Sequence, residues 1–229
     1  MEKLILSPRL RQITELVRPG SVLADVGTDH GYVPVWLMQR GRIAAAIASD
    51  IGAEPLRHAK ETAAEYKVSG IDFRLCAGLD AIDPEEVETI LIAGMGGETI
   101  QTILSDAPWT ADGGHLLLLQ PMTKVELLRK WLSDNQYHFT EERLVCDKNH
   151  LYPVFAVRGG SGTPITLVQQ YGGVMLDGDP LYAAYLEERI AKLYKVMAGL
   201  EKSLDPENAV KVKSLMDICR LLEEKRGTL

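Results

Sequence analysis

The feature that most constrains the fold is a regular alternation of short apolar runs and amphipathic stretches from residue 21 to about residue 158. Such alternation is typical of parallel strands connected by crossover helices. The strands predicted from these runs are 22–26, 44–49, 72–75, 89–93 and 115–119, and the clearest helices between and after them are 53–66, 99–104 and 124–134. This part of the chain is therefore expected to form an open, doubly wound α/β sheet.

The pattern changes in the stretch that follows. Residues 139–146 and 152–157 are strand-like runs joined by the polar turn Asp-Lys-Asn-His, with no room for a crossover helix. They are expected to pair as an antiparallel hairpin. The predicted fold class is α/β, with a Rossmann-like, mostly parallel seven-stranded sheet that ends in this antiparallel hairpin.

The C-terminal part has helical spacing instead. Apolar residues recur at helical intervals from about residue 181, and Asp205-Pro206 interrupts them before a second such stretch begins. The predicted apolar stripes are Leu186, Ile190, Leu193, Val196, Met197 and Leu200, then Val210, Val212, Leu215, Ile218, Leu221 and Leu222. We expect a helical hairpin resembling a coiled coil, and two domains, 1–160 and 161–229.

Composition limits the partners and the compartment. A net charge of −7 and a pI near 5.3 argue against broad attraction to a phosphate backbone. No stretch approaches the roughly 20 apolar residues of a membrane helix. The cysteines, Cys76, Cys146 and Cys219, have the spacing of neither a disulfide framework nor a zinc site. We expect a cytoplasmic monomer or weak homodimer with reduced thiols, without a metal and without a membrane segment.

The most informative motif is Val-Leu-Ala-Asp-Val-Gly-Thr-Asp-His-Gly-Tyr at residues 22–32. It places a glycine turn between the first strand and a helix, at the sheet edge where such folds bind ligands. The residues predicted to bind a cofactor here are Asp25, Gly27, Asp29, Gly31 and Tyr32. The spacing is not G-x-G-x-x-G, because Asp29 stands where a third glycine would be expected.

The charge of Asp29 bears on which cofactor would bind. A carboxylate in this turn would repel a dinucleotide pyrophosphate but would attract the sulfonium and ammonium groups of S-adenosylmethionine (SAM). The terminal hairpin, in place of another parallel strand, also argues against a nicotinamide dehydrogenase. Asp29 could equally cap the following helix, and the two roles are compatible.

Asp50, with Ile51 beside it, follows the second strand about twenty residues after the glycine turn. An acidic side chain at this place can accept hydrogen bonds from both ribose hydroxyls of a cofactor. An isolated aspartate at a strand end is also a common turn former. Its order after the glycine turn favours the ribose role.

A second glycine-rich motif, Ile-Ala-Gly-Met-Gly-Gly-Glu-Thr-Ile, follows the fourth strand at residues 92–100. Its residues predicted to face a cofactor or substrate are Ala93, Gly94, Met95 and Gly97. The alternatives are a plain tight turn and a methionine that only packs. The absence of Asp-Pro-Pro-Tyr or Asn-Pro-Pro-Tyr at this place disfavours methylation of an exocyclic amine.

The candidate catalytic residues are Asp29, His30 and Gln120. Gln120 and Pro121 end the fifth strand and predict an exposed turn, where an amide is suited to contacting a base edge. A turn residue without a ligand is the alternative. His30 could shuttle a proton or cap a helix.

Asp-Val-Gly-Thr-Asp-His-Gly-Tyr, Ile-Ala-Gly-Met-Gly-Gly and Leu-Gln-Pro occur in this order before a hairpin and a helical tail. In these motifs the chain resembles, over nearly its whole length, the bacterial tRNA adenine-22 N1-methyltransferase family (TrmK). The resemblance implies a SAM-binding Rossmann-like domain, a coiled-coil-like C-terminal domain and methyl transfer to N1 of an adenine in the D-arm region of tRNA.

The resemblance also implies roles for individual residues. Gly27 and Asp29 would line the cofactor turn, Asp50 would hold the ribose, Gly78 and Leu79 the cofactor adenine, and 94–97 the methionine end or the target base. Two positions depart from the family pattern. Ala77 stands where an aspartate often holds the adenine amine, so Asp80 or backbone groups would have to substitute, and Met122 stands where an asparagine often follows Gln-Pro.

Methylation at N1 needs alignment more than proton removal, because neutral adenine already presents a lone pair there. We hypothesise that Asp29 stabilises the charge that develops on the base, or accepts from its amino group, with His30 and Gln120 positioning the base. Candidate phosphate contacts are Arg9, Arg11, Arg40, Arg42, Lys124, Arg129 and Lys130, with tail residues Lys192, Lys195, Lys202, Lys211 and Lys213.

Two alternatives stay open from the sequence. A SAM-dependent methyltransferase of a small molecule or a protein would account better for the acidic pI. A non-enzymatic SAM-binding regulator that dimerises through its helices would bind the cofactor without turnover.

Overall fold

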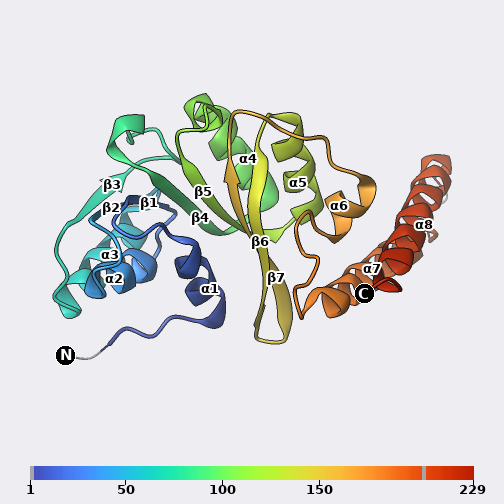
Figure 1. Ribbon diagram of the computed structural model, residues 1–229, viewed down its shortest axis with the longest axis horizontal. Helices are drawn as coiled ribbons and strands as arrows, with labels where there is room; N and C mark the ends of the chain where they lie inside the picture. Colours follow the sequence, from blue (N-terminus) through green and yellow to red (C-terminus); the bar gives the residue numbers. More distant parts are fainter. Residues whose placement is uncertain (1–2, 203–204) are drawn as a thin grey trace. The chain divides into compact units, whose positions relative to one another are not determined.

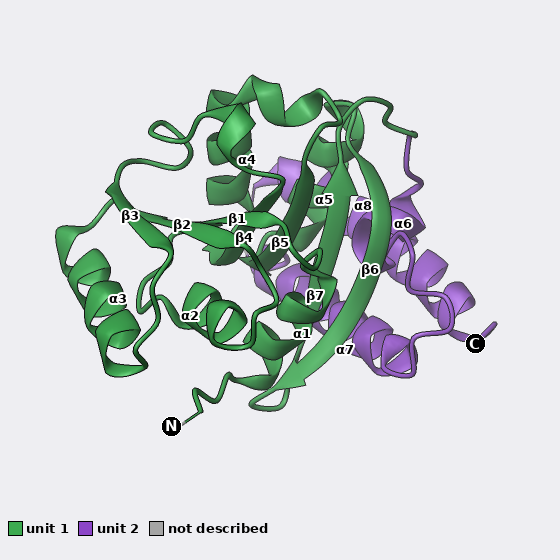
Figure 2. Ribbon diagram, turned by 60° about the vertical axis from the view of Figure 1, so that its left-hand side comes forward, with its two compact units in different colours: residues 1–163 green, residues 164–229 purple. Residues whose placement is uncertain are grey.

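The computed structural model describes residues 3–202 and 205–229. The chain divides into two compact units, residues 1–163 and 164–229, which are coloured separately in Figure 2. The division into two folding domains after residue 160 stays a prediction.

The first unit is built on one seven-stranded sheet with the order β3-β2-β1-β4-β5-β7-β6. Five neighbouring strands are parallel, and β7 pairs antiparallel with both β5 and β6. The strands are β1 (Val22–Val26), β2 (Ala45–Asp50), β3 (Ile71–Leu75), β4 (Thr89–Gly96), β5 (Leu116–Thr123), β6 (His138–Asp147) and β7 (His150–Arg158). The predicted Rossmann-like sheet with its terminal hairpin is confirmed.

Helices cover both faces of this sheet, as Figure 1 shows. Helices α4 (Gly97–Asp106) and α5 (Val125–Asp134) pack on one face, and α1 (Pro8–Leu16) and α2 (Tyr32–Gln39) on the other, where α3 (Ala53–Glu65) packs beside α2. Short 3-10 helices, η1 (Pro84–Glu86) and η2 (Pro108–Ala111), lie in the connections. The sheet is therefore the middle of three layers.

Alternation along the central strands divides the core between the two faces. In β5, Leu117 and Leu119 join the cluster under α4 and α5, whereas Leu118 joins the cluster under α1 and α2. This is the expected consequence of side chains that alternate across a strand. All three leucines are fully buried. Because helices cover both faces of the sheet, its central strands have to be apolar on both sides.

The structure differs from the predicted boundaries at the carboxyl ends of β4 and β5. Both strands extend beyond their apolar runs, to Gly96 and Thr123, and their pairing shifts register around Met95. The turn predicted at Gln120 and Pro121 is wrong, because both residues lie within β5. Helix α1 was not predicted; its Pro8 at the start and the cap from the Ser7 hydroxyl mark it.

The second unit contains α6 (Leu167–Gly172), α7 (Tyr182–Leu200) and α8 (Pro206–Arg226). The predicted hairpin is present: α7 and α8 pack together, and Asp205 caps α8 by accepting from the backbone N–H of Glu207 at 2.9 Å. Within the predicted stripes, Leu186, Ile190, Leu193, Met197, Ile218 and Leu222 are buried. Val196 and Val210 are exposed, so these two lie outside the packed stripes.

No helix in the ranges 3–202 and 205–229 is long and apolar enough to cross a membrane. In the same ranges, no cluster of three or more His, Cys, Asp or Glu side chains is arranged to hold a metal ion. The three cysteines form no disulfide with one another.

Candidate functional site

Two cavities lie side by side at the carboxyl ends of β1, β2 and β4. The first, of about 250 Å³, we call the apolar cavity; it is lined by Val26, Gly27, Ser49, Asp50, Ile51, Cys76, Ala77, Gly78, Leu79, Asp80, Met95, Thr99, Thr102, Ile103 and Asp106. The second, of about 310 Å³, we call the polar cavity; it is lined by Arg9, Leu10, Asp25, Gly27, Thr28, Asp29, His30, Tyr32, Val33, Asp50, Leu91, Ala93, Gly94 and Met95. Gly27, Asp50 and Met95 line both, so a bent ligand at this edge can occupy the two cavities together.

Gly27 and Met95 form the boundary between the cavities. Gly27 has a φ of +71°, and a Cβ at this position would overlap the methyl group of Met95. A side chain is therefore excluded here by both backbone conformation and space. The structure makes Met95 a wall of the site as well as a packing residue.

Asp50 is fixed at the end of β2 by backbone donors. Its carboxylate accepts from the N–H of Gly52 at 2.8 Å and from the N–H of Asp29 at 3.4 Å. A carboxylate offers about four acceptor positions, so it can still receive hydroxyl donors from a ligand. The two predicted roles of Asp50, turn former and ligand acceptor, are compatible in this geometry.

Asp25 is a buried acid at the end of β1. Its carboxylate accepts from the hydroxyl of Thr28 at 2.6 Å, and only 4% of the residue is exposed. Burial raises the pKa of Asp25 to about 6, the Thr28 hydrogen bond opposes this rise, and the charge of Asp50 adds to it. A cation in the polar cavity would favour the ionised form of Asp25.

The turn after Asp25 presents Asp29 to solvent. Its side chain is 70% exposed, and its backbone has a φ of +50°. The helix-capping alternative for Asp29 and for His30 is wrong, because α2 begins after Gly31 and has no side-chain cap. The Asp29 carboxylate thus stays available at the polar cavity, 3.8 Å from the imidazole of His30.

Gln120 is fully buried and lines neither cavity. Its amide oxygen accepts from the guanidinium of Arg9 and, at 3.2 Å, from the backbone N–H of Gly94. Arg9 also lies 3.9 Å from the carboxylate of Asp147 and faces the ring of Tyr152. Gln120 therefore holds Arg9 and Gly94 at the polar cavity instead of facing a ligand itself.

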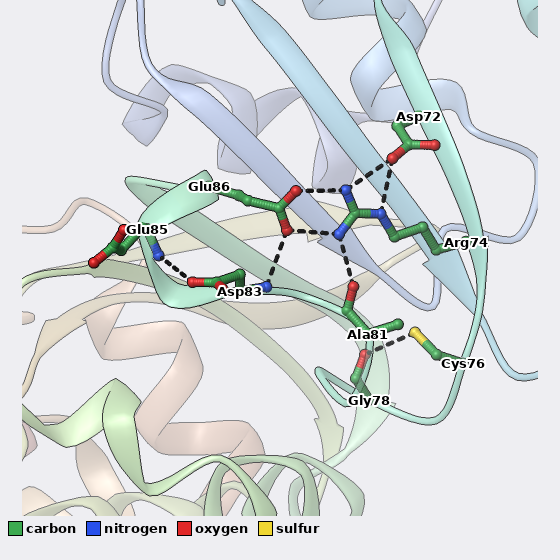
Figure 3. A network of polar contacts seen from close by, with 8 residues as sticks. All are labelled: Asp72, Arg74, Cys76, Gly78, Ala81, Asp83, Glu85 and Glu86. Carbon is green, nitrogen blue, oxygen red and sulfur yellow. Dashed lines mark hydrogen bonds and ion pairs between the residues drawn. The ribbon is translucent and has the colours of Figure 1, made fainter.

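The wall of the apolar cavity between β3 and η1 is fixed by the network in Figure 3. Arg74 donates to Glu86 at 2.7 and 2.8 Å, to Asp72 at 2.8 Å and to the carbonyl of Ala81 at 2.6 Å. The backbone N–H of Asp83 donates to Glu86 at 3.0 Å. Arg74, then this N–H, lower the pKa of Glu86 to about 2. We call this network the Arg74 brace, because it closes the loop that carries Gly78 and Leu79.

Several residues of the site were not predicted from the sequence. One face of α4 lines the apolar cavity with Thr99, Thr102, Ile103 and Asp106. The other three follow Thr99 at intervals of three, four and seven, which is the helical spacing that could have indicated them. Cys76 lines the same cavity, whereas its sequence pattern predicts only a reduced thiol.

Two predicted cofactor residues lie outside both linings. A Cβ at Gly31 would be 2.9 Å from the Cβ of Ala59, and one at Gly97 would be 2.5 Å from the carbonyl oxygen of Lys124. These glycines permit close packing behind the site. The remaining predicted cofactor residues line one cavity or both.

The basic residues predicted to contact phosphate differ in their burial, in their side-chain partners and in whether they line a cavity. Arg129 is wrong as a phosphate contact: it is fully buried and donates to Glu142 at 2.6 Å from α5. Arg40 covers the ring of Trp36 at 3.9 Å, and Lys130 pairs with Asp134. Arg9 alone among them lines a cavity of the site.

A parallel sheet closed by an antiparallel hairpin, with an acidic glycine turn and a divided cleft at its carboxyl edge, defines a methyltransferase fold. Residues 6–155 match the family described as methyltransferase domain. The chain is also 30% identical to the tRNA (adenine(22)-N(1))-methyltransferase of Bacillus subtilis (strain 168), and the alignment covers 98% of each chain. The protein belongs to this tRNA (adenine(22)-N(1))-methyltransferase family.

Solved structures agree with this assignment. The structure of M. capricolum TrmK in complex with S-adenosylhomocysteine, its natural cofactor product, is 25% identical with a TM-score of 0.80, and covers 97% of this chain and 98% of that one. A Streptococcus pneumoniae protein in complex with SAM is 27% identical with a TM-score of 0.82, covering 96% and 99%.

Proposed function

We propose that this protein transfers the methyl group of SAM to N1 of an adenine in tRNA, the adenine at position 22 in the D-arm region. The family assignment supports the activity and the substrate. The single observation that carries the proposal is the divided cleft, whose apolar and polar cavities meet at Gly27, Asp50 and Met95.

The chemistry of the two cavities fits the two ends of SAM. Ile51, Leu79 and Ile103 offer apolar surface for an adenine ring, and Asp50 offers acceptors for the ribose hydroxyls. Asp25 and Asp29 place negative charge where the ammonium and sulfonium groups would lie. Asp80 and Asp106 line the apolar cavity and can supply the acceptor that Ala77 lacks.

SAM supplies an electrophilic methyl group, and the protein aligns the adenine with it. Tyr32 and Gly94 would bound the position of the base in the polar cavity. Asp29 would stabilise the positive charge that develops on the base, or accept from its amino group, and His30 would position it. Gln120 would act through Arg9 and Gly94, which it holds in place.

The target base has to leave its stack to enter this cavity. A net charge of −7 means that tRNA must be bound by local basic groups and by contacts to bases. Arg9 is the basic group best placed for this, because among the predicted phosphate contacts it alone lines the polar cavity. A cytoplasmic location and a monomeric or weakly dimeric state accompany the proposal as predictions.

Methyl transfer from labelled SAM to an unmodified tRNA transcript tests this function. We expect N1-methyladenosine after nucleoside analysis, and loss of the signal when guanine replaces the target adenine. Methylation of protein or of a small molecule without RNA would support the first alternative. SAM binding without transfer to any of these substrates would support the regulator.

The role of Asp29 has its own test. Asp29→Ala should lower kcat for tRNA by about ten-fold to a hundred-fold, because charge stabilisation acts as the base becomes cationic. Asp80→Ala removes an acidic side chain from the apolar cavity and serves as the control. It should raise the KM for SAM and leave kcat less affected. An Asp29→Ala protein that binds SAM normally and methylates at the full rate would remove this role.

A further inference from the structure

Three aromatic rings form a stack, and two of them line the polar cavity. The ring centroids of His30 and Tyr32 are 5.1 Å apart with an interplanar angle of 9°. Those of His30 and His58 are 5.0 Å apart with an angle of 8°. His30 is thus the middle ring of a continuous parallel stack that joins the turn after β1 to α3.

The backbone brings these rings together. Gly31, which separates His30 from Tyr32 in the sequence, adopts a φ of +68°, and its missing side chain lets Ala59 of α3 approach. His58 precedes Ala59 and therefore arrives beside His30. The stack depends on the same Gly31 that lies outside the cavity walls.

The stack is partly exposed and begins at the site. Tyr32 is 40% exposed, and the side chains of His30 and His58 are 42% and 33% exposed. Tyr32 and His30 line the polar cavity, whereas His58 lies beyond it. The rings therefore lead from the cavity toward the outer surface of α3.

The charges around the stack suit a base better than a phosphate. Glu54 lies 3.6 Å from His58, and Asp29 lies 3.8 Å from His30. Arg57 contacts His58 at 3.0 Å, but it also pairs with Glu54 and Glu61. Acidic neighbours repel a phosphate, while the flat faces of aromatic rings stack with any base.

We propose that Tyr32, His30 and His58 form a stacking platform for an unpaired nucleobase of the RNA, next to the adenine that enters the polar cavity. This inference rests on the proposed function, since it places a second base of the same substrate. By extending the stack, the platform holds the flanking base and favours the conformation in which the target adenine is turned out of the helix.

His58 provides the cleanest test, because it lies outside both cavity linings. His58→Ala removes the outer ring, His58→Gln keeps a planar polar group without a ring, and His58→Phe keeps the ring. His150→Ala, which removes an exposed imidazole at the start of β7, is the matched control. Each variant is assayed for its melting temperature, for SAM affinity and for kcat and KM with an unmodified tRNA transcript.

His58→Ala and His58→Gln should raise the KM for tRNA about 5- to 30-fold, as expected for the loss of one stacked base. His58→Phe and His150→Ala should stay within about two-fold of wild type, and SAM affinity should not change. The increase in KM should be the same at about 50 mM and about 200 mM salt, because stacking releases no counterions.

A second measurement does not depend on turnover. A transcript with 2-aminopurine on one side of the target adenine, and then on the other, should lose fluorescence on binding wild type and His58→Phe, and retain more of it with His58→Ala. A His58→Phe protein as defective as His58→Ala, or an unchanged KM in His58→Ala, would overturn the platform. If wild type methylates no tRNA, the proposed function fails instead, and the fluorescence still tests the platform.

Discussion

The amide oxygen of Gln120, a fully buried residue, accepts a hydrogen bond from the backbone N–H of Gly94 at 3.2 Å. The same oxygen accepts from the guanidinium of Arg9. One side chain near the end of β5 therefore fixes both the glycine motif at the carboxyl end of β4 and α1, the only helix that precedes the sheet among the described residues.

Removing this acceptor should impair tRNA methylation through Arg9. Gln120→Met keeps the side-chain length but leaves the Gly94 N–H and Arg9 without their partner, so we expect kcat/KM for tRNA to fall about ten-fold or more, with a stability loss of about 1–3 kcal/mol. Arg9→Lys should reproduce the kinetic defect, because a lysine lacks the planar fork of a guanidinium. Its stability loss should be smaller, because Gln120 still accepts from Gly94. Arg11→Lys, exposed on the same helix, is the control, and an equal defect there would contradict the role of Arg9.

Asp25 should make stability depend on pH. Its pKa rises from the ordinary value of 3.8 to about 6 in the fold, so the folded state holds a proton that the unfolded state has released between these values. Stability should therefore decrease as pH rises through this window, by up to about 3 kcal/mol. Asp25→Asn should lack this decrease and be more stable than wild type at pH 7.5. Urea unfolding at pH 4 and at pH 7.5 measures the difference, and parallel pH profiles in the two proteins would count against it.

The same carboxylate should link SAM affinity to pH in the opposite direction. Only ionised Asp25 attracts the ammonium group, so affinity in wild type should increase as pH rises through about 6. Asp25→Asn should bind SAM more weakly at pH 7.5 and show a flatter profile, measured by calorimetry from pH 5 to pH 8. At pH 7.5 the variant would then be more stable than wild type but bind SAM more weakly. If Asp25→Asn kept the wild-type pH profile of SAM affinity, Asp25 would not be the group that causes the pH dependence.

Gly27 and Met95 should be coupled. Gly27→Ala places a methyl group against that of Met95 and strains a φ of +71°, so SAM affinity should decrease at least about ten-fold. Met95→Ala in the same chain should restore part of the affinity, because it removes the overlap but not the strain. A double-mutant cycle in SAM binding measures this coupling, and additive effects would show that the two residues act separately.

The Arg74 brace should affect SAM binding without affecting chemistry. Glu86→Gln weakens the paired hydrogen bonds that hold the loop with Gly78 and Leu79, so the KM for SAM should rise severalfold while kcat at saturating SAM stays near wild type. Because the pKa of Glu86 is about 2, the brace is ionised throughout the assay range, and it would be lost only as pH falls toward that value. Glu85→Gln changes the same charge one residue away and should have no effect on the KM.

The sequence by itself determined the sheet and the outline of its ligand-binding edge. Apolar runs buried on both faces, and a polar four-residue turn between the last two of them, leave few alternatives to a parallel sheet with an antiparallel hairpin. Gly27, Asp29 and Asp50 were found because strand ends followed by glycine or acid meet at one edge of such a sheet. These are local patterns, and local patterns can be recognised in a sequence.

Only the tertiary structure decided which polar groups face the ligand. Gln120 and Arg129 have side chains that could contact a ligand, but both are buried. Gln120 instead accepts hydrogen bonds from Arg9 and Gly94, and Arg129 pairs with Glu142. His58 comes to stack on His30 although 28 positions separate them in the sequence, because Gly31 lets α3 approach the first turn. Burial and pairing depend on residues distant in the chain, and no local pattern encodes them.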